Sequence, residues 1–232
     1  RAMLRAAVRV VAVSAVRTGC GKSPIARWLG ARLRARGRHV AVLRHPMPYS
    51  DLKRQRAQRF EKIADLDAAG CTVEEREEYE PHLAAGNVVF AGVDYALIAP
   101  QAAAGADVIV WDGGNNDFPF LRPDLHLVVV DALRPDDARG YHPGEAVLQT
   151  ADLVVVNKID AATPDQVARA VATARPVNPS APIVRAASPV RLDDAAAVRG
   201  RRVVVVEDGP TITHGSMPHG AGFVAATAAG AI

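Results

Sequence analysis

The 232-residue sequence predicts an α/β fold of three layers, in which helices cover both faces of a mostly parallel β-sheet. Two observations support this prediction. Short, continuous apolar runs, which suit strands buried on both faces, alternate with stretches of helical spacing. Polar and glycine-rich segments follow these runs, and parallel strands bring such segments to one edge of the sheet. We expect the ligand site at that edge.

The first predicted strand, residues 8–13, leads into VRTGCGKS at residues 16–23, and a helix follows. A strand, a glycine-bearing loop ending in Gly-Lys-Ser and a helix predict a phosphate-binding loop, or P-loop. Gly19 and Gly21 allow the backbone N–H groups to turn toward phosphate oxygens. Lys22 is expected to contact the β- and γ-phosphates, and the Ser23 hydroxyl to bind Mg²⁺.

Two positions of this loop depart from the common pattern. Val16 stands in place of the first glycine, and Arg17 stands where one branch of P-loop proteins carries an additional lysine. We expect Arg17 to stabilise transition-state charge, and Thr18 and Cys20 to bind nucleotide with the rest of the loop. The following helix N-terminus predicts a lowered pKa for the Cys20 thiol. A small residue that fits the loop is favoured over a redox cysteine.

The remaining elements follow from apolar spacing and turn residues. We predict helices over residues 24–36, 52–66, 95–104 and 163–174, and strands over residues 39–43, 87–91, 106–111, 125–131, 152–157, 183–186 and 202–207. The acidic run 74–80 is expected to be mainly a solvated helix face. The alternative is that one of its carboxylates acts as a general base or binds Mg²⁺. All of these elements fit a single P-loop domain over residues 1–232.

Two motifs after later strands carry further chemistry. Asp112 follows an apolar strand, which is the context of the acidic residue that holds Mg²⁺ in P-loop enzymes. We therefore predict Asp112, Lys22 and Arg17 as the catalytic group. Asn157, Lys158 and Asp160 form Asn-Lys-x-Asp after another strand, a spacing suited to binding a nucleotide base. Read literally, this motif favours guanine, so ATP and GTP both stay open.

Candidate substrate ligands lie in the other polar loops. We expect them to bind the anionic groups of a second substrate; they are Arg44, His45, Asn115, Asn116 and His214. The histidine spacing matches no known metal-binding motif. The other histidines, among them His82, are expected to be structural or exposed.

Composition excludes several classes of partner. The net charge is only +3 and the basic residues are dispersed, which argues against nucleic-acid binding. The apolar runs are too short to span a bilayer, and no signal peptide is visible. A cytoplasmic protein without membrane or nucleic-acid partners is expected.

Five segments together resemble cyclic 2,3-diphosphoglycerate synthetase and its bacterial relatives, in the SIMIBI branch of P-loop proteins. These are SAVRTGCGKS, RHPMPYSDL, TVEEREEYEPH, WDGGNNDFPF and ITHGSMPHGAG. The resemblance implies ATP- and Mg²⁺-dependent closure of an intramolecular phosphoanhydride in 2,3-diphosphoglycerate. It also implies a homodimer. Ser50, Ser216 and His219 depart from the glycine, glycine and tyrosine of that family, in loops that would contact the substrate.

Two further expectations follow from the resemblance. Full-length members carry an N-terminal domain and a C-terminal extension, and this chain is expected to be the nucleotide-binding core without them. The alternative function is a regulatory or accessory GTPase whose nucleotide state controls a partner protein. The sequence lacks the Cys-x-x-Cys or Cys-x-Cys motif expected of a metal-delivery protein. A weaker alternative is an inactive remnant, suggested by Val16.

Overall fold

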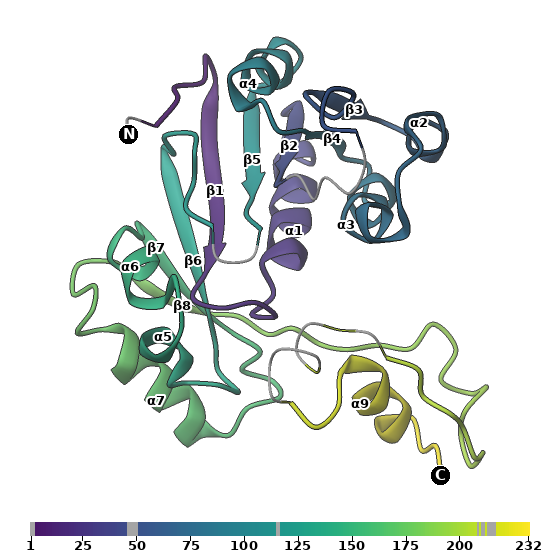
Figure 1. The fold of residues 1–232 in the computed structure, drawn as a ribbon. Helices are drawn as coiled ribbons and strands as arrows, with labels where there is room; N and C mark the ends of the chain where they lie inside the picture. The colour runs from purple at the N-terminus through teal and green to yellow at the C-terminus, as the bar shows by residue number, and fades with distance from the viewer. Residues whose placement is uncertain (1–2, 46–50, 115–116, 208, 210–211, 213–216) are drawn as a thin grey trace.

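The computed structural model contains an eight-stranded sheet with the order β3-β4-β2-β5-β1-β6-β7-β8 (Figure 1). It describes residues 3–45, 51–114, 117–207, 209, 212 and 217–232. The strands are β1 (Arg9–Ala15), β2 (Val40–Arg44), β3 (Gln58–Phe60), β4 (Val88–Ala91), β5 (Val108–Asp112), β6 (Leu125–Asp131), β7 (Leu153–Asn157) and β8 (Ile183–Arg185). Every pairing between these strands is parallel except that of β3 with β4. The predicted mostly parallel sheet is confirmed.

Helices cover both faces of the sheet. The described helices are α1 (Lys22–Arg34), α2 (Ile63–Ala69), α3 (Val73–Ala84), α4 (Tyr95–Ala104), α5 (Asp137–Gly140), α6 (Gly144–Gln149), α7 (Pro164–Ala174) and α9 (Ala221–Ala228). Alternate residues of the central strands enter two separate cores: Val42 and Val110 pack with α1, whereas Leu43 and Trp111 pack with α4. Because successive side chains of a strand point to opposite faces, α1 and α4 lie on opposite sides. The three-layer α/β prediction is confirmed.

Strand register brings the polar strand ends together. Asp112 at the end of β5 is the register partner of both Val13 in β1 and Arg44 in β2. Asp131 at the end of β6 is the register partner of Asn157 at the end of β7. The loop after β1 therefore lies between a β2–β5 group of polar residues and a β6–β7 group.

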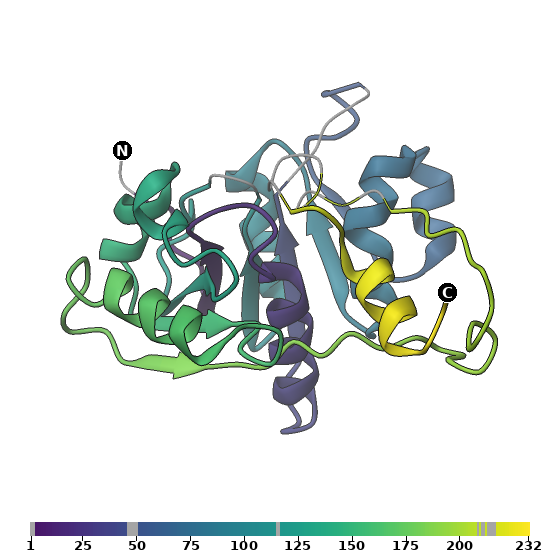
Figure 2. The same cartoon turned by 90° about the horizontal axis from the view of Figure 1, so that it is seen from below.

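Two predicted elements are wrong. Residues 52–66 were expected to form one helix, but they contain β3 and the start of α2, because β3 pairs antiparallel with β4. Residues 202–207 were expected to be a strand, but they pair with none of the described strands. Val204 and Val206 are 91% and 90% exposed. After β8 the chain leaves the sheet and runs to α9 on the other side of the molecule, away from α7 (Figures 1 and 2).

The short helices α5, α6 and α9 were not predicted. Four and six residues, the lengths of α5 and α6, give too few turns for a periodic apolar pattern to be recognised. The predicted helices at residues 95–104 and 163–174 are confirmed as α4 and α7. Asp94 and Thr163 cap these helices by accepting hydrogen bonds from backbone N–H groups of the first turn.

Candidate active site

The loop between β1 and α1 has the backbone geometry expected of a phosphate cradle. Gly19 and Gly21 adopt positive φ angles of 77° and 101°, a backbone conformation that residues other than glycine rarely adopt. At Gly21 the restriction is also spatial, because an added Cβ would lie 2.4 Å from the Asn157 Nδ2 atom. Glycine is therefore required at position 21 for two independent reasons.

Three consecutive carbonyl groups of this loop are held from outside. The Arg134 guanidinium donates to the Thr18 carbonyl (2.9 Å), the Lys158 ammonium donates to that of Gly19 (2.7 Å), and the Asn157 amide donates to that of Cys20 (2.9 Å). The carbonyl and N–H of one trans peptide group point in opposite directions, so these contacts direct the N–H groups of Gly19, Cys20 and Gly21 to the other side, where an anion would bind.

A buried carboxylate organises the donors on this side. Asp131, at the end of β6, accepts from Lys158 at 2.8 Å and from Arg134 Nη2 at 2.9 Å. Both donors also hold loop carbonyls, so Asp131 fixes their positions and offsets their charge. Asp131 and Arg134 were not among the predicted site residues. The strand-end position that singled out Asp112 applies equally to Asp131, and this was the available signal.

Lys22 begins α1 and is almost fully buried. Burial lowers the pKa of its ammonium group, and the nearby Asp112 carboxylate partly offsets this effect. A desolvated ammonium at a helix N-terminus suits the binding of phosphate oxygens. The position of Lys22 is compatible with its predicted role, which stays a prediction.

Asp112 ends β5 and is fully buried. Its Oδ2 atom lies 2.9 Å from His82 Nε2, and its Oδ1 atom lies 3.8 Å from Arg44 Nη1. Burial alone would raise the pKa of Asp112, but Arg44, His82 and Ser23 outweigh it and lower the pKa to about 2. The carboxylate is therefore ionised at neutral pH although it lies in the interior.

The residues present fit a magnesium ion. Asp112 Oδ1 is buried and accepts no hydrogen bond, and an ionised carboxylate oxygen is a ligand that Mg²⁺ prefers. Ser23, in the first turn of α1, is close enough to contribute to the lowered pKa of Asp112. Ser23 and Asp112 would hold the ion, as predicted. Among the described residues no group of three or more His, Cys, Asp or Glu side chains could hold a metal by itself.

Arg17 lies on the β6 side of the loop and is engaged there. Its Nη1 atom donates to Asp137 Oδ2 at 2.9 Å, and its guanidinium stacks on the Tyr141 ring at 3.6 Å from the centroid. Asp137 belongs to α5, which the sequence pattern did not reveal. The predicted catalytic role of Arg17 would require the guanidinium to leave these partners.

The predicted substrate ligands fall into two groups. Arg44 is buried, donates to the carbonyl groups of Asp112 and Gly113, and forms an ion pair with Glu78. His45 pairs with Asp117 at 2.5 Å. Asn115, Asn116 and His214, together with Ser50 and Ser216, lie outside the described residues. Arg44 is thus fixed in the wall of the site by protein partners, and its predicted role as a substrate ligand stays a prediction.

The base-binding motif is partly used in the structure. Asn157 and Lys158 hold the phosphate loop, as described above. Asp160 is exposed, and its Oδ1 atom accepts from the Ser188 N–H at 2.7 Å. The loop after β8 therefore orients this carboxylate while leaving it accessible. Base binding by these three residues stays a prediction.

Two expectations about side-chain chemistry are corrected. Burial raises the pKa of the Cys20 thiol instead of the helix N-terminus lowering it. The acidic run in α3 is not simply a solvated face, because Glu75 is buried and accepts from Gln55, and Glu78 pairs with Arg44. His82, expected to be structural or exposed, is buried against Asp112.

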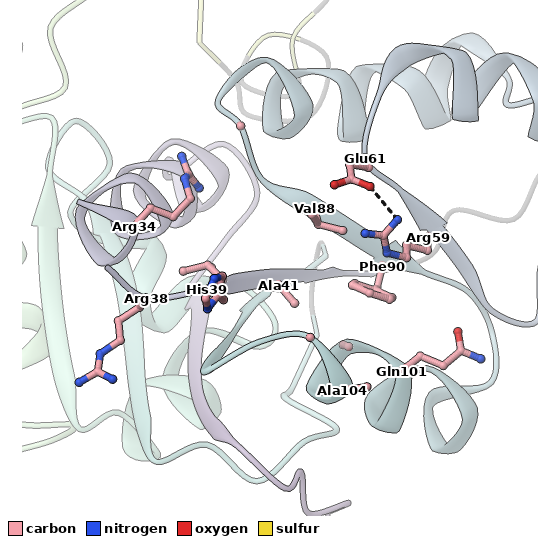
Figure 3. Close-up of a pocket in the computed structure, with 14 residues that line it drawn as sticks. Arg34, Arg38, His39, Ala41, Arg59, Glu61, Val88, Phe90, Gln101 and Ala104 are labelled. Carbon is pink, nitrogen blue, oxygen red and sulfur yellow. Dashed lines mark hydrogen bonds and ion pairs between the residues drawn. The ribbon is translucent and has the colours of Figure 1, made fainter. Parts of the chain in front are cut away.

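A separate cavity of about 560 Å³ lies at the opposite edge of the sheet, where β2 and β4 begin (Figure 3). Its lining includes Arg34, Arg38 and Arg59. Figure 3 shows that Arg34 and Arg38 point away from one another and that Arg59 pairs with Glu61. These charges do not converge on one point, and we assign the cavity no function.

Across the described part of the chain, no helix combines the length and apolar character needed to cross a membrane.

Comparison with known proteins identifies a nucleotide-binding family. The sequence matches the family described as CobW/HypB/UreG, nucleotide-binding domain, over residues 17–185. A protein of Thermococcus kodakarensis named arginine synthetase ArcE is 52% identical over 229 residues, covering 99% of this chain and 51% of that protein. A tetraacyldisaccharide 4'-kinase of Anaeromyxobacter dehalogenans is 32% identical, covering 87% of this chain and 57% of that protein. The chain thus spans about half the length of the curated relatives it matches.

LpxK from Aquifex aeolicus in complex with ATP is 19% identical, with a TM-score of 0.49 over 67% of this chain and 50% of that one. The fold, the glycine loop and the family match together define a P-loop nucleoside triphosphatase. The chain belongs to the CobW/HypB/UreG nucleotide-binding domain family.

Proposed function

We propose that this chain is the nucleotide-binding part of a Mg²⁺-dependent, ATP-driven synthetase that transfers the γ-phosphoryl group to a small anionic acceptor. The observation that carries the proposal is that Lys22 and the ionised Asp112 are both buried at the phosphate loop and that the Asp112 Oδ1 atom accepts no hydrogen bond. The names of the relatives, a synthetase and a kinase, support phosphoryl transfer to a small molecule over a purely regulatory role.

Each residue would contribute a separate effect. The loop N–H groups and Lys22 would bind the β- and γ-phosphates and offset their charge. Asp112 and Ser23 would hold Mg²⁺, which when bound supplies positive charge opposite the phosphate oxygens. The carbonyl groups fixed by Asn157, Lys158 and Arg134 would keep the loop rigid, so that little reorganisation is needed during transfer.

Two reactions are proposed from different observations. The sequence resemblance implies 2,3-diphosphoglycerate, whose neighbouring phosphate would displace inorganic phosphate and close a cyclic phosphoanhydride. The name of the 52% identical relative implies a reaction that forms arginine. A cytoplasmic location and a homodimer, both expected from the sequence, belong to the same proposal.

The first experiment is calorimetric titration with ATP and with GTP in the presence of Mg²⁺. Lys22→Ala is expected to abolish binding, whereas Lys53→Ala, an exposed lysine outside the site, is the matched control. 2,3-Diphosphoglycerate is then added and phosphate release is measured. In parallel, arginine, ADP and phosphate are supplied and ATP formation is followed. Phosphate release that 2,3-diphosphoglycerate leaves unchanged, together with no ATP formation from arginine, ADP and phosphate, would contradict both reactions.

A second candidate is a GTP-dependent regulatory protein. The specific observation in its favour is Asp160, held by Ser188 with its carboxylate accessible. A carboxylate accepts the paired N–H donors of guanine, which adenine lacks. If this function holds, Asp160→Asn weakens GTP binding by at least about tenfold, as expected for loss of a charge-assisted hydrogen bond, and leaves ATP binding unchanged.

A further inference from the structure

A chain of buried hydrogen bonds lies behind Asp112. His82, near the end of α3, contacts Asp112 Oδ2 through Nε2 at 2.9 Å. The other ring nitrogen, Nδ1, lies 3.3 Å from the Asn87 Nδ2 atom. Asn87 in turn accepts a hydrogen bond from Arg34, at the end of α1. His82, Asn87 and Asp112 are all buried, so these contacts are not shared with bulk water.

The chemistry of the groups fixes the direction of every bond. A guanidinium can only donate, so the Asn87 oxygen faces Arg34 and its NH₂ group faces His82. An NH₂ group donates to Nδ1, and this nitrogen must then carry a lone pair. The ring proton consequently resides on Nε2 and is donated to the Asp112 carboxylate. Arg34 and Asn87 thereby select one tautomer of His82.

This arrangement uses one carboxylate oxygen of Asp112 as a hydrogen-bond acceptor and leaves the other without a donor. With Oδ2 bound to His82, Oδ1 is the atom that accepts no hydrogen bond. We propose that His82 is a positioning residue which, held in the Nε2–H tautomer by Asn87 and Arg34, orients the Asp112 carboxylate so that Oδ1 faces the metal. The role toward the metal rests on the proposed function; the tautomer and the orientation of the carboxylate do not.

A matched pair of variants separates positioning from simple core packing. In His82→Gln the amide nitrogen reaches the place of Nε2 and can still donate to Asp112. In His82→Asn the shorter amide reaches only the place of Nδ1, so Asp112 Oδ2 loses its donor. The affinity of each protein for Mn²⁺ is measured by electron paramagnetic resonance in the presence of a non-hydrolysable ATP analogue. Affinity for the analogue without metal serves as the control for folding of the site.

We expect His82→Gln to bind Mn²⁺ nearly as well as the original protein, and His82→Asn to bind about 10–100-fold more weakly, the usual effect of losing an outer-shell partner. Equal affinity in all three proteins, or equal loss in both variants, would overturn the metal-positioning role.

A second measurement does not depend on metal or activity. Long-range ¹H–¹⁵N spectra of the metal-free protein report which nitrogen of His82 carries the proton. A proton on Nε2 is expected, and a proton on Nδ1 would overturn the proposal whatever the protein catalyses. If the original protein binds no Mn²⁺ but His82 shows the expected tautomer, the proposed function fails and the orientation of Asp112 by His82 stands.

Discussion

The two sides of the phosphate loop each hold a buried carboxylate, but the two carboxylates differ in their hydrogen bonds. On the β6–β7 side, Asp131 accepts from Arg134 and Lys158. On the β2–β5 side, Asp112 pairs with His82 and retains a buried oxygen without a donor. Both carboxylates end parallel strands and both are buried.

The difference lies in what the donors do. Lys158 and Arg134 also bind loop carbonyls, so the charge of Asp131 is used within the protein to shape the backbone. The donors of Asp112 leave one oxygen available, at the cost of keeping a buried carboxylate ionised. We infer that the first side is scaffold and the second is the reactive side. Four predictions test this distinction, from the largest effect to the smallest.

Gly21→Ala should have the largest effect, because it disturbs the scaffold where the loop meets Asn157. The positive φ costs ~1–2 kcal/mol for a residue with a Cβ, and the clash with Asn157 adds to it. We expect loss of nucleotide binding together with a lower free energy of unfolding in urea. Gly37→Ala is the matched control, since Gly37 has a φ of 73° and nothing within 4 Å of an added Cβ. Equal losses in both variants would show that the Asn157 contact is unimportant.

Asp112→Asn should weaken the pH dependence of the free energy of unfolding, because Asp112 is the buried ionised carboxylate of the reactive side. The pKa of Asp112 is lowered to about 2 in the folded protein, whereas it is about 3.9 in an unfolded chain. The unfolded state therefore binds more protons than the folded state between these pH values. As a result, the free energy of unfolding falls by about 2 kcal/mol as the pH falls from about 5 to 2. Denaturant unfolding at several pH values should show this slope in the original protein and a shallower one in Asp112→Asn. Identical slopes would contradict an ionised, stabilised Asp112.

Asn157→Ala should have a smaller effect, confined to the scaffold. It removes the donor to the Cys20 carbonyl, which is expected to lower the free energy of unfolding by about 1 kcal/mol. Nucleotide affinity should fall as well, because the loop is less rigid. Asn178→Ala is a useful comparison, since Asn178 also holds backbone carbonyls but lies far along the chain from the phosphate loop. It should lower stability without changing nucleotide affinity.

The rate at which the Cys20 thiol is alkylated should report how rigid the phosphate loop is. Its thiol is buried and burial raises its pKa, so alkylation at pH 8 should be slow in the native protein. Cys71 is the internal reference, because it is partly exposed and lies outside the phosphate loop; burial raises its pKa to about 11. Asn157→Ala should accelerate modification of Cys20 and leave Cys71 unchanged. Mass spectrometry of the alkylated peptides measures both rates at once.

Sequence reasoning identified those parts of the candidate site that lie close together in the sequence or next to a clear strand pattern. Gly19, Gly21, Lys22 and Ser23 form one motif, and Asp112 directly follows a buried strand. His82 and Arg134 could not be recognised in this way. Each becomes part of the site only through a partner 30 or 116 positions away in the chain, Asp112 for His82 and Thr18 for Arg134.

The same limit applies to the fold. Long apolar strands such as β6 were predicted with the correct boundaries because burial on both faces leaves a clear pattern. The valines at residues 203–206 show an equally clear pattern but form no strand, because strand formation also requires a neighbour. Only three-dimensional structure shows that the chain has already left the sheet edge at β8.

The hydrogen bonds that hold the phosphate loop also bear on when the loop can reach its shape during synthesis of the chain. The loop itself is complete at residue 23, yet the donors that hold its carbonyl groups come from residues 134, 157 and 158. At 5–20 residues per second a ribosome needs on the order of ten seconds to supply them. Until then the nascent chain carries a phosphate-binding sequence without a phosphate-binding shape. We therefore expect nucleotide binding to begin only after the central strands have been made and paired.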